Sequence, residues 1–202
     1  MARHDERLAR LQADMVAAGI HAAVLLHPRD VLYYTNTVRP SALVVTRNGS
    51  ALLVRRGLEW ARADIGAVPV EPMSGVGDIA KALAALGARP EGVGSGALAS
   101  TLVLGTEFDV VPAQVYRRLM EVLGPNGSAG GGWSIVDIAP LVLAQRAVKD
   151  ADEIAATRAA AAVADVGHTA LVEAIAPGVS ELDLAALAEA AMRRAGHEAY
   201  QP

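Results

Sequence analysis

The sequence predicts an α/β domain with a mixed β-sheet flanked by helices, followed by an antiparallel pair of helices. Three observations lead to this prediction. Short apolar segments of strand length alternate with segments of helical periodicity through the first 147 residues. Two of the strands are separated only by a short turn, so the sheet contains a hairpin and cannot be purely parallel. Two long helical segments follow residue 148.

The first elements are a helix and a buried strand. Apolar residues between Leu8 and Val16 recur at helical spacing, and Gly19 stands where a C-cap is expected, which predicts an amphipathic helix over residues 4–18. Residues 22–26 form a continuous apolar run, typical of a strand that is buried on both faces. Residues 31–36 then predict a short helical turn or a loop.

A hairpin gives the clearest local signal. Two apolar segments, 41–46 and 51–55, lie on either side of Asn48 and Gly49. Asn-Gly is the preferred pair for a type I′ turn, which needs a positive φ at both central residues. The sequence therefore predicts two antiparallel strands joined by a turn of this type.

The remaining elements of the first domain follow from shorter patterns. We expect a helix over 57–65, a strand over 68–70, a helix over 76–86 closed by Gly87, a strand near Val93, a strand or loop over 98–104, a helix from Pro112, and a strand over 133–138 that leads into 141–146.

A domain boundary is expected near residue 148, which gives domains over 1–147 and 148–202. Asp150 and Glu153 have the spacing of a capping box for a helix that runs to about residue 175. Ser180 and Asp183 cap a second helix, and the short connection favours an antiparallel pair. The apolar face of this pair would lack a sheet to cover, so the second domain is expected to be incomplete. This face consists of Ile154, Leu171, Ile175, Leu182 and Leu187.

Composition excludes several classes of function. The chain has 202 residues, a formal net charge of −4 and no clustered basic stripe, which argues against a nucleic-acid partner. Cysteine is absent, so disulfides and thiolate sites are excluded. The charged N-terminus is not a signal peptide and no apolar run is long enough to cross a membrane, so we expect a cytoplasmic protein without membrane contact.

Catalytic and metal-binding residues cannot be identified in the sequence. The five histidines lack close ligand spacing, and His168 and His197 are explained as a helix-surface residue and a residue at a helix end. The carboxylates at 150–153 and 181–183 sit in first turns of helices, where capping explains them better than metal binding. We therefore expect neither a catalytic residue nor a metal ligand in this chain.

Three further features have both a functional and a simpler explanation. Residues 92–97 satisfy the form Gly-x-Gly-x-x-Ala, but no acidic residue follows about 20 positions later, so a dinucleotide site is disfavoured. Ser41, Ser74 and Ser95 are not part of a nucleophile-elbow motif and have no recognisable base nearby in the sequence, so nucleophilic catalysis is unsupported. Arg39 lies directly before the hairpin, where a loop arginine on rigid strands could clamp a carboxylate or could simply be solvated.

Four segments together resemble a known family. They are Arg7–Ile20, Asp30–Thr46, Val136–Ile154 with Arg146 and Lys149 inside it, and Pro177–Leu182. Their order and spacing resemble the N-terminal part of the creatinase/Xaa-Pro aminopeptidase group of pita-bread metallohydrolases. In the third segment Asp150-Ala-Asp152 stands where that group has Ser-Pro-Glu. The resemblance implies a creatinase N-terminal-type domain, followed by the first helices of a truncated α+β catalytic domain.

The resemblance also implies functions for the complete enzyme. Such an enzyme would be a homodimer that cleaves Xaa-Pro peptides with two divalent ions, manganese or cobalt, held by aspartates, a histidine and glutamates of its catalytic domain. None of those ligands can be assigned here, so this chain is expected to bind no metal and to be inactive. Arg39 matches a substrate-binding arginine that reaches toward the partner. The alternatives are a fragment of a creatinase-like amidine hydrolase and a stand-alone, non-catalytic dimerisation or regulatory module.

Overall fold

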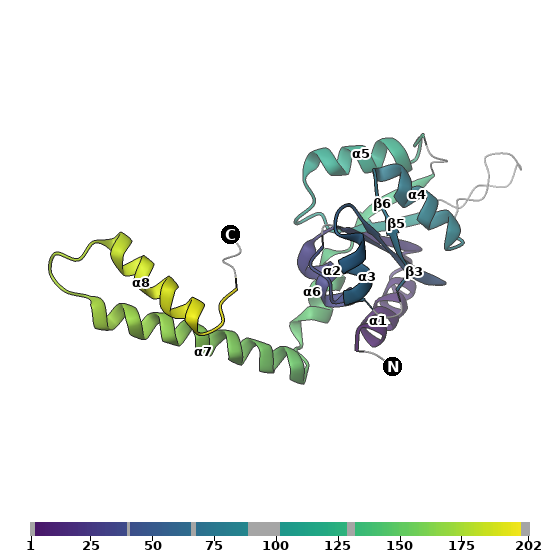
Figure 1. The fold of residues 1–202 in the computed structure, drawn as a ribbon. Coiled ribbons are helices and arrows are strands. Elements are labelled where there is room, and N and C mark those ends of the chain that lie inside the picture. The colour runs from purple at the N-terminus through teal and green to yellow at the C-terminus, as the bar shows by residue number, and fades with distance from the viewer. Residues whose placement is uncertain (1–2, 40, 66–67, 89–101, 129–131, 199–202) are drawn as a thin grey trace, which may run out of the picture. The chain divides into compact units, whose positions relative to one another are not determined.

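The computed structural model describes residues 3–39, 41–65, 68–88, 102–128 and 132–198 (Figure 1). The chain divides into two compact units, residues 1–147 and residues 148–202. The first unit contains α1 (Arg3–Ala17), β1 (Ala22–Leu25), α2 (Pro28–Thr35), β2 (Ser41–Thr46), β3 (Gly49–Val54), α3 (Leu58–Asp64), β4 (Val70–Pro72), α4 (Val76–Ala85), β5 (Leu102–Thr106), α5 (Ala113–Leu123), β6 (Trp133–Asp137) and α6 (Ala139–Ala147). The second unit contains α7 (Ala151–Ala174) and α8 (Glu181–Arg194).

A six-stranded sheet in the order β4-β3-β2-β1-β5-β6 forms the centre of the first unit. Strand β2 is antiparallel to β1 and β3, whereas the pairs β3–β4, β1–β5 and β5–β6 are parallel. The predicted mixed sheet is therefore confirmed. Because only β2 runs in the opposite direction, the carboxyl ends of β1, β3, β4, β5 and β6 meet at one edge, together with the start of β2.

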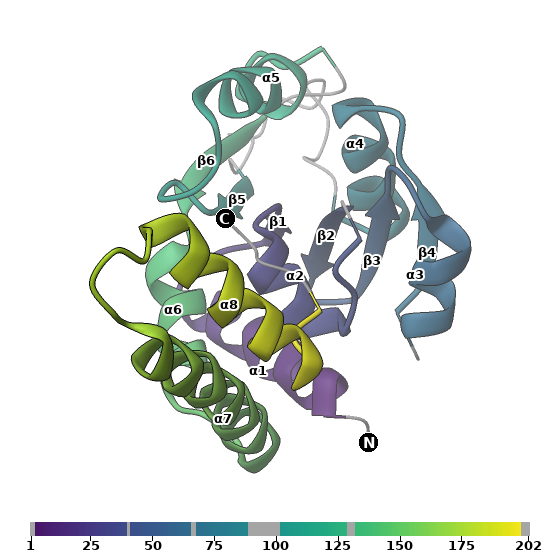
Figure 2. The same ribbon diagram turned by 60° about the vertical axis from the view of Figure 1, so that its left-hand side comes forward.

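Both faces of the sheet are covered, because successive side chains of a strand point to opposite faces. Leu25 of β1 and Leu43 of β2 pack with residues of α1, α2, α3 and α6. Their neighbours Val24 and Val44 pack on the other face with residues of α4 and α5. Figure 2 shows α4 and α5 on one side of the sheet and α1 and α6 on the other. The central strands are buried on both faces, as the apolar run at 22–26 predicts.

The hairpin is confirmed, but its turn is not of the predicted type. Thr46 pairs with Gly49, so the two turn residues are Arg47 and Asn48 rather than Asn48 and Gly49. None of these residues has a positive φ. The reason is a side chain: the Thr46 hydroxyl accepts a hydrogen bond from the backbone N–H of Asn48 at 3.2 Å. This local bond holds a turn that does not need the left-handed conformation.

Three other elements differ from their predicted bounds. Helix α2 begins at Pro28, whose fixed φ suits the first turn of a helix. Strand β4 spans Val70–Pro72 rather than 68–70. The segment after β6 is a helix, α6, which starts where the Asp137 carboxylate accepts the backbone N–H of Ala139 at 2.9 Å. The strand expected near Val93, the glycine pattern at 92–97 and Ser95 lie outside the described residues.

The second unit is a pair of antiparallel helices that lie side by side in Figure 1. The predicted capping box is present: the Asp150 carboxylate accepts the N–H of Glu153 at 2.8 Å, and the Glu153 carboxylate accepts the N–H of Asp150 at 3.1 Å. Ser180 caps α8 by accepting the N–H of Asp183. The helices are in close contact at Gly167, where a Cβ atom would lie 2.6 Å from Cγ of Met192.

Candidate functional site

Arg39 lies at the edge of the sheet where five strands end, directly before β2. Its guanidinium carbon lies 4.9 Å from the centroid of the Trp60 ring, which is a cation–π distance. The Arg39 Nε atom is buried and has no hydrogen-bond partner among the described residues. No ion pair to a carboxylate is found for Arg39 in that part of the chain either. The guanidinium is thus positioned by an aromatic ring and keeps donors available for an anion.

Local contacts hold the Arg39 backbone. The Thr37 hydroxyl donates to the Asp64 carboxylate at 2.9 Å and accepts the N–H of Arg39 at 3.3 Å. The Ser41 hydroxyl donates to the carbonyl oxygen of Arg39 at 2.7 Å. These bonds connect the loop to α3 and to β2, so the arginine is presented by a fixed segment rather than by a free one.

Gly57 makes the close approach of Arg39 and Trp60 possible. Its φ is +75°, which favours glycine, and a Cβ there would lie 3.2 Å from Cδ of Arg39 and 3.0 Å from Cε3 of Trp60. Trp60 itself remains 63% exposed. The sequence identified Arg39 as a candidate, whereas it gave no signal that Trp60 would be its partner, because the stacking depends on this turn.

A buried polar cluster beneath the same edge joins two of the sequence segments noted above. The Arg146 guanidinium of α6 donates to the Asp30 carboxylate of α2, and that carboxylate also lies 3.3 Å from Nδ1 of His27. Gln145, next to Arg146, accepts the Tyr34 hydroxyl at 2.8 Å. Burial raises the pKa of Tyr34, so its hydroxyl stays protonated as the donor. Arg146 therefore stabilises the packing of α6 on α2.

Glu107 is a fully buried acid at the carboxyl end of β5. Its carboxylate accepts the N–H of Leu26 at 2.9 Å and the N–H of His27 at 3.3 Å, which ties β5 to the end of β1. Burial raises the pKa of Glu107 from its ordinary value of 4.5 to about 7, although the two backbone bonds oppose this shift. No sequence pattern pointed to this residue, since its burial follows from the pairing of β1 with β5.

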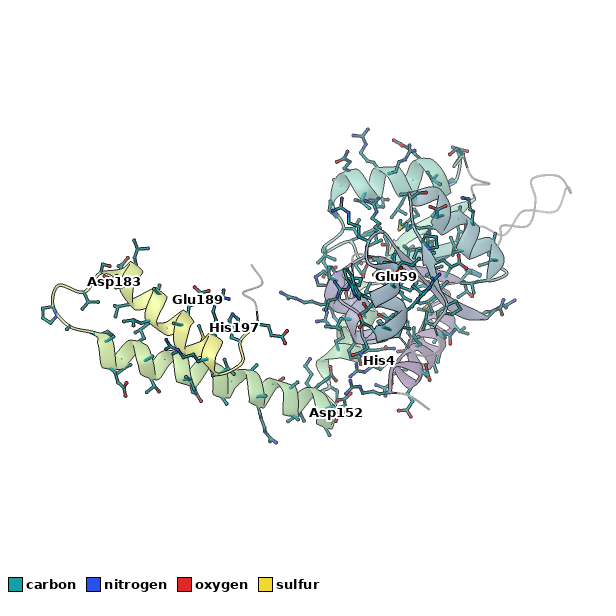
Figure 3. The ribbon with its side chains drawn as sticks, in the orientation of Figure 1. His4, Glu59, Asp152, Asp183, Glu189 and His197 are labelled. Carbon is teal, nitrogen blue, oxygen red and sulfur yellow. The ribbon has the colours of Figure 1, made fainter. Side chains whose placement is uncertain are left out.

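The described residues do not fit a centre for divalent metal ions. They contain no group of three His, Asp or Glu side chains close enough to hold an ion. Among the residues labelled in Figure 3, His4 lies on α1, Glu59 on α3 and Glu189 on α8, and His197 follows the end of α8. His168 is exposed on α7, and the carboxylates of Asp150 and Glu153 serve as helix caps.

None of the described helices combines the length and apolar character needed to cross a bilayer.

Comparison with known proteins adds to this geometry. Residues 7–148 match the family model described as the Creatinase/Prolidase N-terminal domain. The chain is 29% identical over 199 residues to the creatinase of Bacillus sp. (strain B-0618), covering 93% of this chain and 44% of that protein.

Solved structures show the same fold. The Xaa-Pro dipeptidase from Bacillus anthracis superposes with a TM-score of 0.78 at 22% identity, covering 96% of this chain and 50% of that one. The prolidase from Pyrococcus horikoshii OT3 gives a TM-score of 0.75 at 22% identity with the same two coverages. The chain thus spans about half the length of the relatives it matches. Since the family model covers most of the sequence, the chain belongs to the creatinase/prolidase N-terminal domain family.

Proposed function

We propose that these 202 residues act as the N-terminal half of a Xaa-Pro aminopeptidase- or dipeptidase-like metallohydrolase. The family membership, the coverage of about half of each relative and the absence of a metal-ligand group from the described residues support this proposal. Two divalent ions, manganese or cobalt, would belong to the other half of the enzyme. The chain alone would bind no catalytic metal and hydrolyse nothing. The lack of cysteine supports a reducing compartment such as the cytoplasm.

The role proposed for this half is to bind the carboxylate of the substrate through Arg39. The observation that carries the proposal is the buried Arg39 Nε atom without a hydrogen-bond partner in the described chain, on a guanidinium stacked against Trp60. A guanidinium can donate two parallel hydrogen bonds to a carboxylate. An oriented arginine without a carboxylate partner among the described residues is therefore suited to a dipeptide, which carries a free carboxylate.

We also propose that the enzyme is a homodimer in which this edge of the sheet contacts the partner. Four exposed apolar residues follow or precede the strand ends near Arg39 and Glu107: Val38, Trp60, Phe108 and Val110. Exposed apolar groups that gather near a polar site are typical of interaction surfaces. In such a dimer Arg39 would reach the substrate of the neighbouring subunit and help to exclude water.

Fluorescence of Trp60 tests the role of Arg39. The chain has two tryptophans, and Trp133 is buried, so a Trp133→Phe background isolates the Trp60 signal. We expect Gly-Pro to change this signal saturably, with an affinity on the order of millimolar, and Gly-Pro amide to have little effect. Arg39→Ala should abolish the response and Arg39→Lys should weaken it, because lysine cannot form the bidentate pair.

A matched control is Arg10→Gln, which removes an exposed arginine from α1 without touching this edge. The control variant should titrate like its parent. A titration that is unchanged by Arg39→Ala would contradict the proposed role of Arg39.

An activity assay and the coding sequence test the larger proposal. We expect no cleavage of Xaa-Pro dipeptides by the purified chain with added Mn²⁺ or Co²⁺, and clear turnover would contradict the absence of a catalytic centre. An open reading frame that continues into a set of aspartate, histidine and glutamate ligands would support the proposal. A frame without such a continuation would favour the stand-alone dimerisation or regulatory module.

A creatinase-like amidine hydrolase is the second candidate. The observation in its favour is the 29% identity to a creatinase over 93% of this chain. Creatine also carries a carboxylate, so Arg39 would serve either substrate. Titration of the Trp60 signal with creatine and with Gly-Pro distinguishes the two candidates, because the true ligand class should bind more tightly.

A further inference from the structure

A cavity of about 680 Å³ lies between α4, α5 and the sheet edge, on the face opposite α1 and α6. Such a volume lies within the usual range for small-molecule sites, about 300–1,000 Å³. Its walls are mainly apolar and include Val76 and Ile79 of α4, Val115 and Leu119 of α5, and Leu26 after β1. The cavity is separate from the stacked pair of Arg39 and Trp60, since neither residue lines it.

Cationic side chains also line this cavity. Arg55, at the end of β3, and Arg117 and Arg118, on α5, all contribute. Arg118 forms an ion pair with Glu121 at 2.9 Å. Within the described ranges, no carboxylate partner is found for Arg55 or Arg117. Three arginines and one glutamate give these lining residues a formal charge of +2, on a chain whose net charge is −4.

We propose that this cavity binds a small amphiphilic anion, a molecule with an apolar body and a carboxylate head. The apolar walls would receive the body, because its transfer from water removes apolar surface on both sides. The carboxylate would pair with Arg55 and Arg117, which have charge available for an anion. A cationic head would be repelled by the same residues, and a neutral head would leave them unpaired.

The inference is independent of the proposed hydrolase role, because the charged residues that would bind the anion are not those around Arg39. Only Ser41 belongs to both places. Ser41 lines the cavity and its hydroxyl donates to the carbonyl oxygen of Arg39. The cavity and the Arg39 loop are therefore neighbours without sharing a charged group. A test of the cavity can succeed or fail without deciding whether Arg39 binds a dipeptide.

Isothermal titration of the full 202-residue chain with octanoate tests this inference. We expect saturable binding of octanoate at one site. Octanamide, which has no charge, octylammonium, which has the opposite charge, and acetate, which has no long apolar body, should each bind more weakly. Arg55→Gln and Arg117→Gln should each weaken octanoate binding roughly two- to five-fold, as expected for exposed charge pairs. The double variant should lose more than either single variant.

Two further variants keep the result interpretable. Val115→Phe places a larger side chain in the wall and should abolish binding, and a thermal melt establishes that this variant remains folded. Arg158→Gln removes the same charge from an exposed position of α7 and should leave octanoate binding unchanged. Equal binding of octanamide and octanoate, non-saturable uptake, or unchanged affinity in the double arginine variant would each overturn the inference.

Discussion

The first unit packs its apolar side chains against both faces of a six-stranded sheet, whereas the second unit buries almost none of its own. Among the described residues of α7 and α8 only Gly167 is buried. Of the five residues of the predicted apolar face, Leu171 is half-buried and the other four are exposed, namely Ile154, Ile175, Leu182 and Leu187; Leu182 is 82% exposed. In the first unit, by contrast, two separate apolar clusters fill both sides of the sheet.

The two units therefore differ in how much apolar burial stabilises them. Burial of apolar surface is the dominant stabilising term in folding, so we expect the first unit to fold by itself. The helices of the second unit are well capped, but most of the stability of a helix in a protein comes from packing an apolar face. Both tryptophans lie in the first unit, so their fluorescence reports its unfolding, whereas circular dichroism reports both units.

The largest expected effect comes from a core residue of the first unit. Leu52 of β3 is fully buried, so Leu52→Ala should lower the free energy of unfolding by about 2–5 kcal/mol through lost burial and a residual cavity. Chemical denaturation followed by tryptophan fluorescence measures this change. An effect below about 1 kcal/mol would mean that the first unit is not the well-packed domain described above.

Glu107 should make the stability of the first unit depend on pH. Its pKa is raised to about 7 in the folded state, so its contribution to stability is fully present below pH 4.5 and is lost as the pH rises through 7. Glu107→Gln removes this titration and keeps an oxygen that can accept the N–H of Leu26. We expect the stability of the variant relative to the parent chain to increase by about 1–3 kcal/mol between pH 5 and pH 8. Denaturation curves of both proteins at pH 5 and pH 8 measure this change. If the difference in free energy of unfolding between variant and parent were the same at both pH values, the raised pKa of Glu107 would be refuted.

A substitution at Gly167 tests the close contact between α7 and α8. A side chain there would collide with Met192, so Gly167→Leu should destabilise the pair by about 1–2 kcal/mol despite the better helix propensity of leucine. The loss should appear in the helical circular dichroism signal and leave the tryptophan transition in place. Ala164→Leu, at an exposed position of the same helix, is the control and should not separate the two signals.

The smallest effect on stability is expected at Leu182. Leu182→Ser should change the free energy of unfolding by less than about 0.5 kcal/mol, because the side chain is mostly exposed. We expect the exposed apolar face of α7 and α8 to cause some self-association of the chain. Leu182→Ser should reduce this self-association, which light scattering measures. A clear loss of stability would show that Leu182 is packed in solution, and that the contrast between the units is smaller than described.

Local signals predicted most of the elements, and long-range contacts account for the differences. The capping residues Asp150 and Ser180 act within one turn of helix, so their sequence spacing was enough. The turn at Arg47 and Asn48 depends on which residue pairs with Gly49, and an Asn-Gly pair alone does not decide the register. The position of β5 beside β1 joins strands that are distant in sequence, and no local pattern encodes such a neighbour.

The candidate site was predictable only in part, for a similar reason. Arg39 could be selected because a loop before a hairpin is a recognisable position. Trp60 and Glu107 could not, since the first depends on the turn at Gly57 and the second on burial by β1. The cavity between α4 and α5 likewise arises from the spacing of two helices on one face of the sheet, and its arginines come from separate segments.

Strand β4, at one edge of the sheet, has a consequence for assembly. It is three residues long, carries the exposed Glu71 and ends on Pro72, which has no N–H to donate. Short edges with a charge and a proline are poor templates for an incoming strand. Copies of this domain are therefore protected on this side from joining edge to edge into fibrils of the amyloid type.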